Sequence, residues 1–217
     1  MAEPKLEKII DSLQKHLAFG KAHLAIAKGL LSADPVVLQT ANVFFSLTLD
    51  GSLQLSQICA AKLYDKPRGA VTVRTLLFAA EKEAGLFANG TPAQVRGAIC
   101  RSKDRVKTLH SILESIEKRR NEILVHLDPQ TVINPQVLLA NAALTVPQIS
   151  TVFEETGKIL NEIGALYSGV TSDFNLFGWD DYEMALKLIA DAKCAQADKY
   201  EKEFHQPAPF ARPRSCS

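Results

Sequence analysis

The sequence has few features of a metal-binding or membrane protein. It has four cysteines, and no two of them form a Cys-x-x-Cys pair, so a zinc knuckle or a thioredoxin-like site has no support. No stretch approaches the roughly 18 apolar residues that a membrane helix needs, and the N-terminus lacks a basic start followed by an apolar run. We therefore expect a cytoplasmic protein with no membrane contact, metal or cofactor, and with Cys59 and Cys100 as reduced core thiols.

The chain also lacks a large excess of charge of either sign. The formal net charge is +1, which gives no overall signature of nucleic-acid binding. The distribution is uneven, because residues 91–127 hold eight Lys or Arg against four Asp or Glu, and residues 151–203 hold five Lys against eleven Asp or Glu. The simplest interpretation is a pair of solvated helix faces, one basic and one acidic.

No alternating strand pattern is present, and the apolar residues recur with a helical period throughout. The sequence therefore predicts an all-α protein, an antiparallel helical bundle with long helices and additional C-terminal helices. We expect a single domain over 1–204, with a core at 1–128, a helical extension at 129–204 and a disordered, proline-containing tail at 205–217. The predicted helices cover residues 4–33, 34–63, 73–86, 91–127, 134–143, 147–167 and 180–204.

The central predicted helix begins at Thr91-Pro92, where threonine can cap the helix and Gln94 can return a hydrogen bond. It ends before Pro129. Its apolar stripe consists of Val95, Ile99, Val106, Leu109, Leu113, Ile116, Ile123 and Leu127. Ser102 and Arg120 interrupt this stripe, and a guanidinium on an apolar seam is costly unless an anion meets it.

Arg120 belongs to a group of residues with the chemistry of metal-free RNA cleavage. A neutral imidazole at His126 can take a proton from a ribose 2′-hydroxyl, and the Arg120 fork can hold the phosphate. Asn121 adds a neutral hydrogen-bonding group. On a continuous helix, six residues place two side chains about 120° apart, so the helix must loosen near Asn121 or a second subunit must complete the site.

The spacing alone is not specific, because Arg105 with His110, and Arg119 with His126, also fit Arg-x(4–6)-His. The seam position of Arg120, its neighbour Asn121 and the helix end beyond His126 distinguish it. The other histidines have simpler interpretations. His110 is expected at a helix surface, and His16 and His23 lack the acidic or cysteine partners of a metal site.

The motif Arg120-Asn121-x4-His126 resembles the signature of the HEPN superfamily of helical-bundle ribonucleases. The following Leu127-Asp128, and the upstream stretch 61–77 with Asp65, are similar to its abortive-infection AbiU-like branch. The resemblance covers about residues 63–128. The long segment after Pro129 departs from it and calls the usual dimer surface of that superfamily into question.

This resemblance implies a metal-independent endoribonuclease that leaves 2′,3′-cyclic phosphate ends and acts in phage defence, a toxin–antitoxin system or RNA processing. It implies a homodimer in which two motif copies form one composite site, RNA or a nucleotide as ligand, and an antitoxin or regulatory protein as a further partner. Arg120, His126 and Asn121 would be catalytic. Arg119, Lys118 and Asp128 would bind substrate.

Two alternatives remain open on the sequence. The chain could be a non-catalytic helical module that binds a nucleotide, an RNA or a protein. It could also be a structural dimerising bundle, in which Arg120 pairs with Glu117 or another acid. The aromatic loop 174–179 could stack on a base, although packing on the core is the simpler expectation.

Overall fold

The computed structural model describes the chain except for residues 1–4, 66–68, 122–142, 177, 179 and 217. Within the described residues all regular structure is helical, which confirms the all-α class. In the same residues no helix is both long and apolar enough to cross a bilayer. The chain divides into two compact units. We call residues 1–22 and 54–176 the bundle unit, and residues 23–53 and 177–217 the tail unit.

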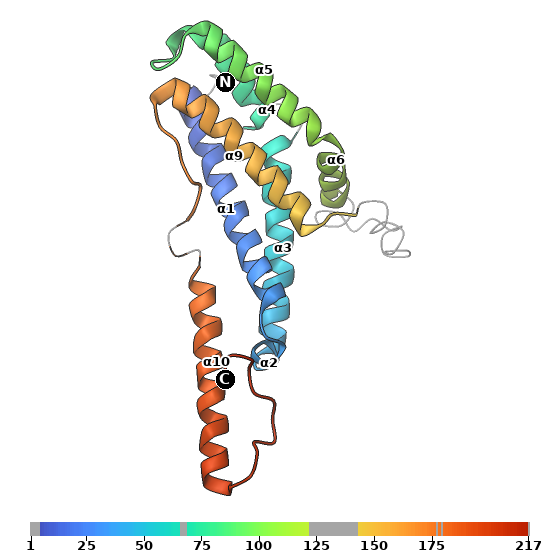
Figure 1. Cartoon of the computed structure of the whole chain (residues 1–217). Coiled ribbons are helices and arrows are strands. Elements are labelled where there is room, and N and C mark those ends of the chain that lie inside the picture. Colours follow the sequence, from blue (N-terminus) through green and yellow to red (C-terminus); the bar gives the residue numbers. More distant parts are fainter. Residues whose placement is uncertain (1–4, 66–68, 122–142, 177, 179, 217) are drawn as a thin grey trace. The chain divides into compact units, whose positions relative to one another are not determined.

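The helices carry the labels of Figure 1. They are α1 (Leu6–Ser32), α2 (Pro35–Gln39), α3 (Asn42–Tyr64), α4 (Val73–Lys82), η1 (Ala84–Leu86), α5 (Pro92–Thr108), α6 (His110–Arg119), α9 (Val146–Ser168) and α10 (Asp181–Phe204). Because α1 and α3 each contribute residues to both units, the division into units does not follow the boundary at residue 128 that the sequence predicts.

Threonine capping boxes fix the starts of three helices. The side chains of Thr72, Thr91 and Thr145 each accept a hydrogen bond from the backbone N–H three residues later. The backbone N–H of each threonine donates in turn to the side-chain oxygen of that later residue. These bonds satisfy N–H groups that a helix start leaves unpaired. The caps at Thr72 and Thr91 confirm the predicted starts. Helix α10 differs, because Asp180 precedes it without a side-chain cap hydrogen bond.

The predicted helix over 91–127 is interrupted at Leu109, which joins α5 to α6. There the Leu109 N–H bonds to the Val106 carbonyl in a tighter turn. The sequence pattern hides this break because α5 and α6 both contact α9, so the apolar stripe continues while the helix changes direction (Figure 1). The helix predicted over 34–63 is likewise divided, at Thr40-Ala41, into α2 and α3.

Helix α5 is central to the bundle unit, because it contacts α4, η1, α6 and α9. The interior is closely packed where α1 meets α9, and a Cβ on Gly20 would approach the Phe153 ring to 2.5 Å. Phe174 is buried and packs beside Gly157 on α9, as expected for a loop packed on the core. The fully buried side chains of this unit include Leu6, Leu13, Leu17, Leu63, Leu76, Ile99, Leu109, Ile116, Phe153 and Leu160.

The tail unit holds its C-terminal segment in specific contacts. Arg212 pairs with Asp198 at 3.0 Å and with Glu201 at 2.7 Å on α10, and Cys194 forms a disulfide with Cys216. Arg212 and Cys216 therefore contact α10, while the disorder of residues 205–217 stays a prediction. The sequence pattern does not reveal these contacts because each one joins the tail to residues well before it.

The two remaining cysteines are free. Cys59 is half-buried, but Cys100 is exposed, so the expectation that both are core thiols is wrong for Cys100. Helix α5 turns the Cys100 side chain away from the neighbouring buried positions Ala98, Ile99 and Ser102.

Candidate functional site

Arg120 lies where the regular α-helix ends. Helix α6 stops at Arg119, and Arg120 and Asn121 form the start of a π-helical turn. Such wider turns inside helices are rare and frequent at functional sites. The backbone therefore departs from the regular α-helix at Arg120 and Asn121, and a loosened helix there is one of the two ways in which Arg120 and His126 could act on one ligand.

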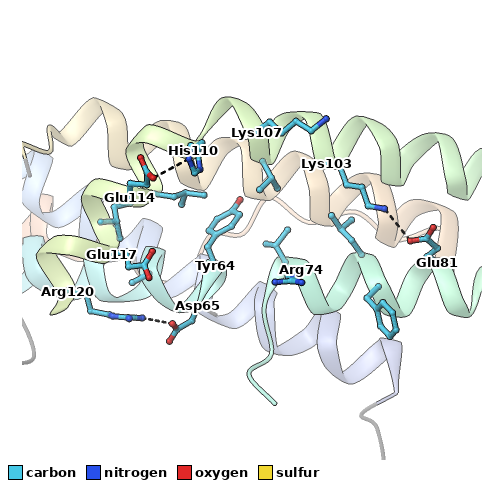
Figure 2. Close-up of a pocket in the computed structure, with 17 residues that line it drawn as sticks. Tyr64, Asp65, Arg74, Glu81, Lys103, Lys107, His110, Glu114, Glu117 and Arg120 are labelled. Carbon is cyan, nitrogen blue, oxygen red and sulfur yellow. Dashed lines mark hydrogen bonds and ion pairs between the residues drawn. The ribbon is translucent and has the colours of Figure 1, made fainter. Parts of the chain in front are cut away.

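The Arg120 guanidinium is held from two sides. Nη1 donates a hydrogen bond of 2.6 Å to Oδ1 of Asp65, directly after α3 (Figure 2). Nε and Nη2 donate bonds of 3.0 and 2.8 Å to Oδ1 of Asn121. Both members of the ion pair are mostly covered, with side-chain exposures of 22% for Arg120 and 26% for Asp65. The predicted need for an anion beside Arg120 is thus met by Asp65.

These contacts fix the plane of the guanidinium. An arginine recognises a phosphate or carboxylate through planar, forked hydrogen bonds, so its orientation decides whether it can do so. Asn121 is exposed and lies beside the charge as an acceptor. Asp65, Arg120 and Asn121 form a unit that orients the guanidinium, which has five N–H donors and uses three of them in these bonds.

The other predicted site residues are placed only in part. Lys118 and Arg119 lie in the last turn of α6, and both side chains are half-buried. Burial lowers the pKa of the Arg119 guanidinium. His126 and Asp128 lie outside the described residues, so the structure does not test whether His126 meets Arg120.

A pocket of about 620 Å³ adjoins Arg120 within the bundle unit. This volume is in the range of small-molecule sites. Figure 2 shows Tyr64 at its centre and Arg120 with Asp65 at one end. Its walls come from the end of α3, from α4, and from α5 and α6. The lining residues are Ala61, Tyr64, Asp65, Val73, Arg74, Leu77, Phe78, Glu81, Lys103, Val106, Lys107, His110, Leu113, Glu114, Ile116, Glu117 and Arg120.

Tyr64 joins this pocket to α9 through a hydrogen-bond relay. Its hydroxyl lies 2.7 Å from Oγ1 of Thr156, which itself donates to the Val152 carbonyl at 2.7 Å. Since a hydroxyl has one hydrogen to donate, Tyr64 must be the donor to Thr156. Burial raises the pKa of Tyr64 to about 12, so the phenol is neutral at physiological pH and is no candidate for a general base.

The charged residues around the pocket are largely paired with one another. Lys103 lies 3.3 Å from Glu81, and His110 lies 3.3 Å from Glu114 (Figure 2). Lys107 pairs with Asp104 at 2.8 Å. These are exposed pairs, which contribute little to stability. Their effect is to leave a nearly neutral rim around an apolar interior.

The uneven charge noted in the sequence reflects pairing between two helices. Arg101 and Arg105 on α5 bind Glu162 and Glu155 on α9, at 2.6 and 2.8 Å. Hydrogen bonds from Lys158 and then Arg105 lower the pKa of Glu155. Two basic side chains of α5 are therefore paired with acidic side chains of α9 within the bundle unit, so part of the uneven charge is balanced between these helices.

Sequence reasoning missed most of the pocket. Arg74, Phe78 and Glu81 lie on one face of α4, since their spacing is four and then three residues. This spacing is a signal that could have shown a shared face, although not what lies opposite. His110 follows Arg105 with four residues between them, which fits the looser Arg-x(4–6)-His pattern but not the five-residue spacing of Arg120 and His126.

The protein-family comparison agrees with the all-α fold. Residues 3–190 match the family HEPN_AbiU2, described as AbiU2. The fold and the match together define an all-helical HEPN domain of the kind associated with abortive infection, and the chain belongs to the AbiU2 family. The match runs beyond Pro129, so the following segment as far as residue 190 is part of the family and not a departure from it. Neither the curated proteins nor the solved structures give a match.

Proposed function

We propose that the protein is a metal-independent endoribonuclease of the HEPN kind, which acts in phage defence or a toxin–antitoxin system. The observation that carries this proposal is the Arg120 guanidinium, which Asp65 and Asn121 hold at the mouth of a ligand-sized pocket. A fixed guanidinium can stabilise negative charge on a phosphate as it develops, without reorganising during the reaction.

The proposed reaction uses the ribose 2′-hydroxyl as nucleophile. His126 takes its proton, the 2′-oxygen forms a bond to phosphorus, and the bond from phosphorus to the 5′-oxygen breaks. Arg120 binds the non-bridging oxygens while their charge increases. A protonated imidazole donates to the leaving 5′-oxygen. The products are a 2′,3′-cyclic phosphate and a 5′-hydroxyl.

A homodimer supplies the second imidazole in this scheme. One His126 acts as base and the other as acid, with both Arg120 side chains on the phosphate. Lys118 and Arg119 from the last turn of α6, together with Asp128, would contact the flanking RNA. A toxic nuclease of this kind needs restraint by an antitoxin or regulatory protein.

The decisive experiment incubates the purified protein with mixed RNA in EDTA, beside His126→Ala. Cleavage that survives the chelator and leaves cyclic phosphate ends is expected, with a loss of roughly 10²- to 10⁴-fold in the variant. Arg120→Ala should cause similar damage while the protein remains folded by circular dichroism. Normal cleavage by His126→Ala would refute the assignment.

One observation favours a second candidate, a non-catalytic RNA- or nucleotide-binding module. Arg120 already donates three hydrogen bonds to Asp65 and Asn121, which suits binding as well as catalysis. This candidate predicts that the parent binds RNA without cleaving it, and that Arg120→Ala weakens the binding.

A further inference from the structure

We propose that the pocket beside Arg120 binds one base of the RNA, next to the phosphate that Arg120 holds. The inference rests on the proposed function and adds to it a site that selects the base. The pocket would give the enzyme a cleavage preference through the shape and stacking of that base.

The position of the pocket supports this assignment. Arg120 and Asp65 are among its lining residues and lie at one end of it (Figure 2). A phosphate bound by Arg120 therefore has its attached nucleotide at the pocket entrance. The volume of about 620 Å³ leaves room for a base and its sugar, since pockets of 300 to 1,000 Å³ are typical for small organic ligands.

The chemistry of the walls fits an uncharged, flat ligand better than a second anion. The interior is apolar and includes Val73, Leu77, Val106, Leu113 and Ile116. The lysines and the histidine around it are paired with acidic side chains. Arg120 is also paired, with Asp65, but its guanidinium has N–H donors beyond the three used there and can still donate to a phosphate. A base finds a surface on which apolar contact is favourable.

Phe78 supplies the aromatic surface that such a base requires. Its side chain is 65% exposed although it lines the pocket, and an exposed ring beside a nucleic-acid site is a stacking platform. Arg74 lies one helical turn before Phe78 on the same face of α4. Its guanidinium can stack on the base or approach the next phosphate.

The test compares Phe78→Ala with the parent and two controls. Phe78→Tyr keeps an aromatic ring, and Phe44→Ala removes a phenylalanine of similar exposure, 63%, that does not line the pocket. Fluorescein-labelled 2′-O-methyl heptanucleotides of A, C, G and U serve as uncleavable probes, and anisotropy gives the dissociation constants. Cleavage sites in a mixed RNA are mapped in parallel.

Phe78→Ala should weaken binding of the preferred probe by roughly 5- to 100-fold, the effect of losing one base stack. It should also flatten the preference among the four probes and among the mapped cleavage sites. Phe78→Tyr and Phe44→Ala should remain within about twofold of the parent, since neither removes the stacking ring from the pocket. Because Phe78 is exposed, its loss should leave the melting temperature nearly unchanged.

Each contrary result has a separate meaning. If the parent cleaves RNA and Phe78→Ala keeps the parental affinity and base preference, the base pocket is refuted and the ribonuclease proposal is not. A parent that binds without cleaving, in a Phe78-dependent way, rejects the ribonuclease and supports the pocket. A parent that neither binds nor cleaves overturns both.

A last experiment uses free nucleoside 5′-monophosphates as competitors of the labelled heptanucleotides. They share the base chemistry but lack the neighbouring nucleotides, so they should compete much more weakly than the heptanucleotides. A monophosphate that binds as tightly as the heptanucleotide, in a Phe78-dependent way, would mark an effector site and overturn the assignment to the RNA substrate.

Discussion

The carboxylate of Asp65 lies 2.6 Å from Nη1 of Arg120, although 55 residues separate them in the chain. Asp65 lies at the end of the pocket wall formed by α3, and Arg120 lies at the end of the wall formed by α6. The pair therefore connects the end of α3 to the end of α6 and sets the direction of the guanidinium. Asp65 does not itself contact the proposed phosphate and acts as a positioning residue.

Substitution of Asp65 should lower cleavage through this positioning role. A hydrogen bond to a charged group contributes about 1.5–3 kcal/mol, so Asp65→Ala should lower kcat/KM by roughly 10- to 100-fold. Asp65→Asn keeps an acceptor oxygen and should be less damaged. If positioning is the cause, kcat should fall more than KM rises. An Asp65→Ala protein that melts normally and cleaves at the parental rate would contradict this role.

His110 is the alternative to His126 as the proposed catalytic base. It follows Arg105 with four residues between them, within the Arg-x(4–6)-His range, but its side chain is 76% exposed and lies beside Glu114. Arg105 is bound to Glu155 and does not face the same ligand. His110 also lines the pocket that we propose for the base. We therefore expect His110→Ala to change KM more than kcat, while His126→Ala loses roughly 10²- to 10⁴-fold in cleavage rate. A reversed order in a fragment-release assay would move the catalytic base to His110.

Tyr64 should make stability depend on alkaline pH. Its pKa is raised to about 12 in the folded protein, against about 10 in an unfolded chain. The folded state therefore binds the proton more tightly, and this stabilisation is complete below pH 10 and lost as pH rises toward 12. The loss should reach roughly 2–3 kcal/mol.

The measurement is urea unfolding between pH 9 and pH 12 for the parent and for Tyr64→Phe. The Tyr64→Phe variant has no phenol at this position, so its free energy of unfolding should fall less as the pH rises. The other tyrosines are present in both proteins, so their contributions cancel in the comparison. Equal slopes for the two proteins would show that Tyr64 titrates normally, and would contradict its burial and its bond to Thr156.

Two glycines in long helices should respond to alanine in opposite directions. A Cβ at Gly20 would meet the buried Phe153 ring, so Gly20→Ala should destabilise the protein by about 1–3 kcal/mol through overpacking. Nothing lies within 4 Å of a Cβ at Gly51 in α3, so Gly51→Ala should stabilise it by about 0.5–1 kcal/mol. Thermal melts of both variants test the packing, and a stabilising Gly20→Ala would contradict it.

The cysteines should fall into three classes of reactivity. Exposed Cys100 should react quickly with a thiol reagent, and Cys59 slowly, because burial raises the pKa of its thiol. Cys194 and Cys216 should react only after reduction. A count of four fast thiols in the unreduced protein would contradict the disulfide.

The disulfide should also affect stability. It closes a 22-residue separation, for which chain entropy gives roughly 3 kcal/mol. The double variant Cys194→Ser/Cys216→Ser should therefore melt below the parent without reductant and alongside it with reductant. Limited proteolysis of the tail is a second test. Reduction breaks the disulfide but leaves the two ion pairs of Arg212, so the tail should be cleaved faster in the reduced protein than in the oxidised one.

Features set by neighbouring residues could be predicted from the sequence. The capping boxes at Thr72 and Thr91 use residues three positions apart, so the chain itself contains the signal. The break at Leu109 could not be predicted, because packing of both helices on α9 keeps the apolar stripe unbroken across it. Whether a helix stays straight depends on the surface that it packs against.

For the candidate site, too, only the features set by neighbouring residues could be predicted from the sequence. The seam position of Arg120 implied an anionic partner, but not which one, since Asp65 is 55 residues away. The pocket was not predictable, because its walls come from four helices that the fold brings together. The disulfide joins residues with no motif spacing, and only the fold brings their sulfurs together.

The ion pairs between α5 and α9 have a consequence for how quickly RNA would arrive. Proteins that attract nucleic acid from a distance release counterions on binding, and their affinity falls steeply with salt. Here Arg101 and Arg105 already bind glutamates, and the net charge is +1. A ribonuclease built in this way gains little long-range steering from these two arginines. The salt dependence of its affinity should then come from the proposed phosphate contacts of Arg120, Lys118 and Arg119.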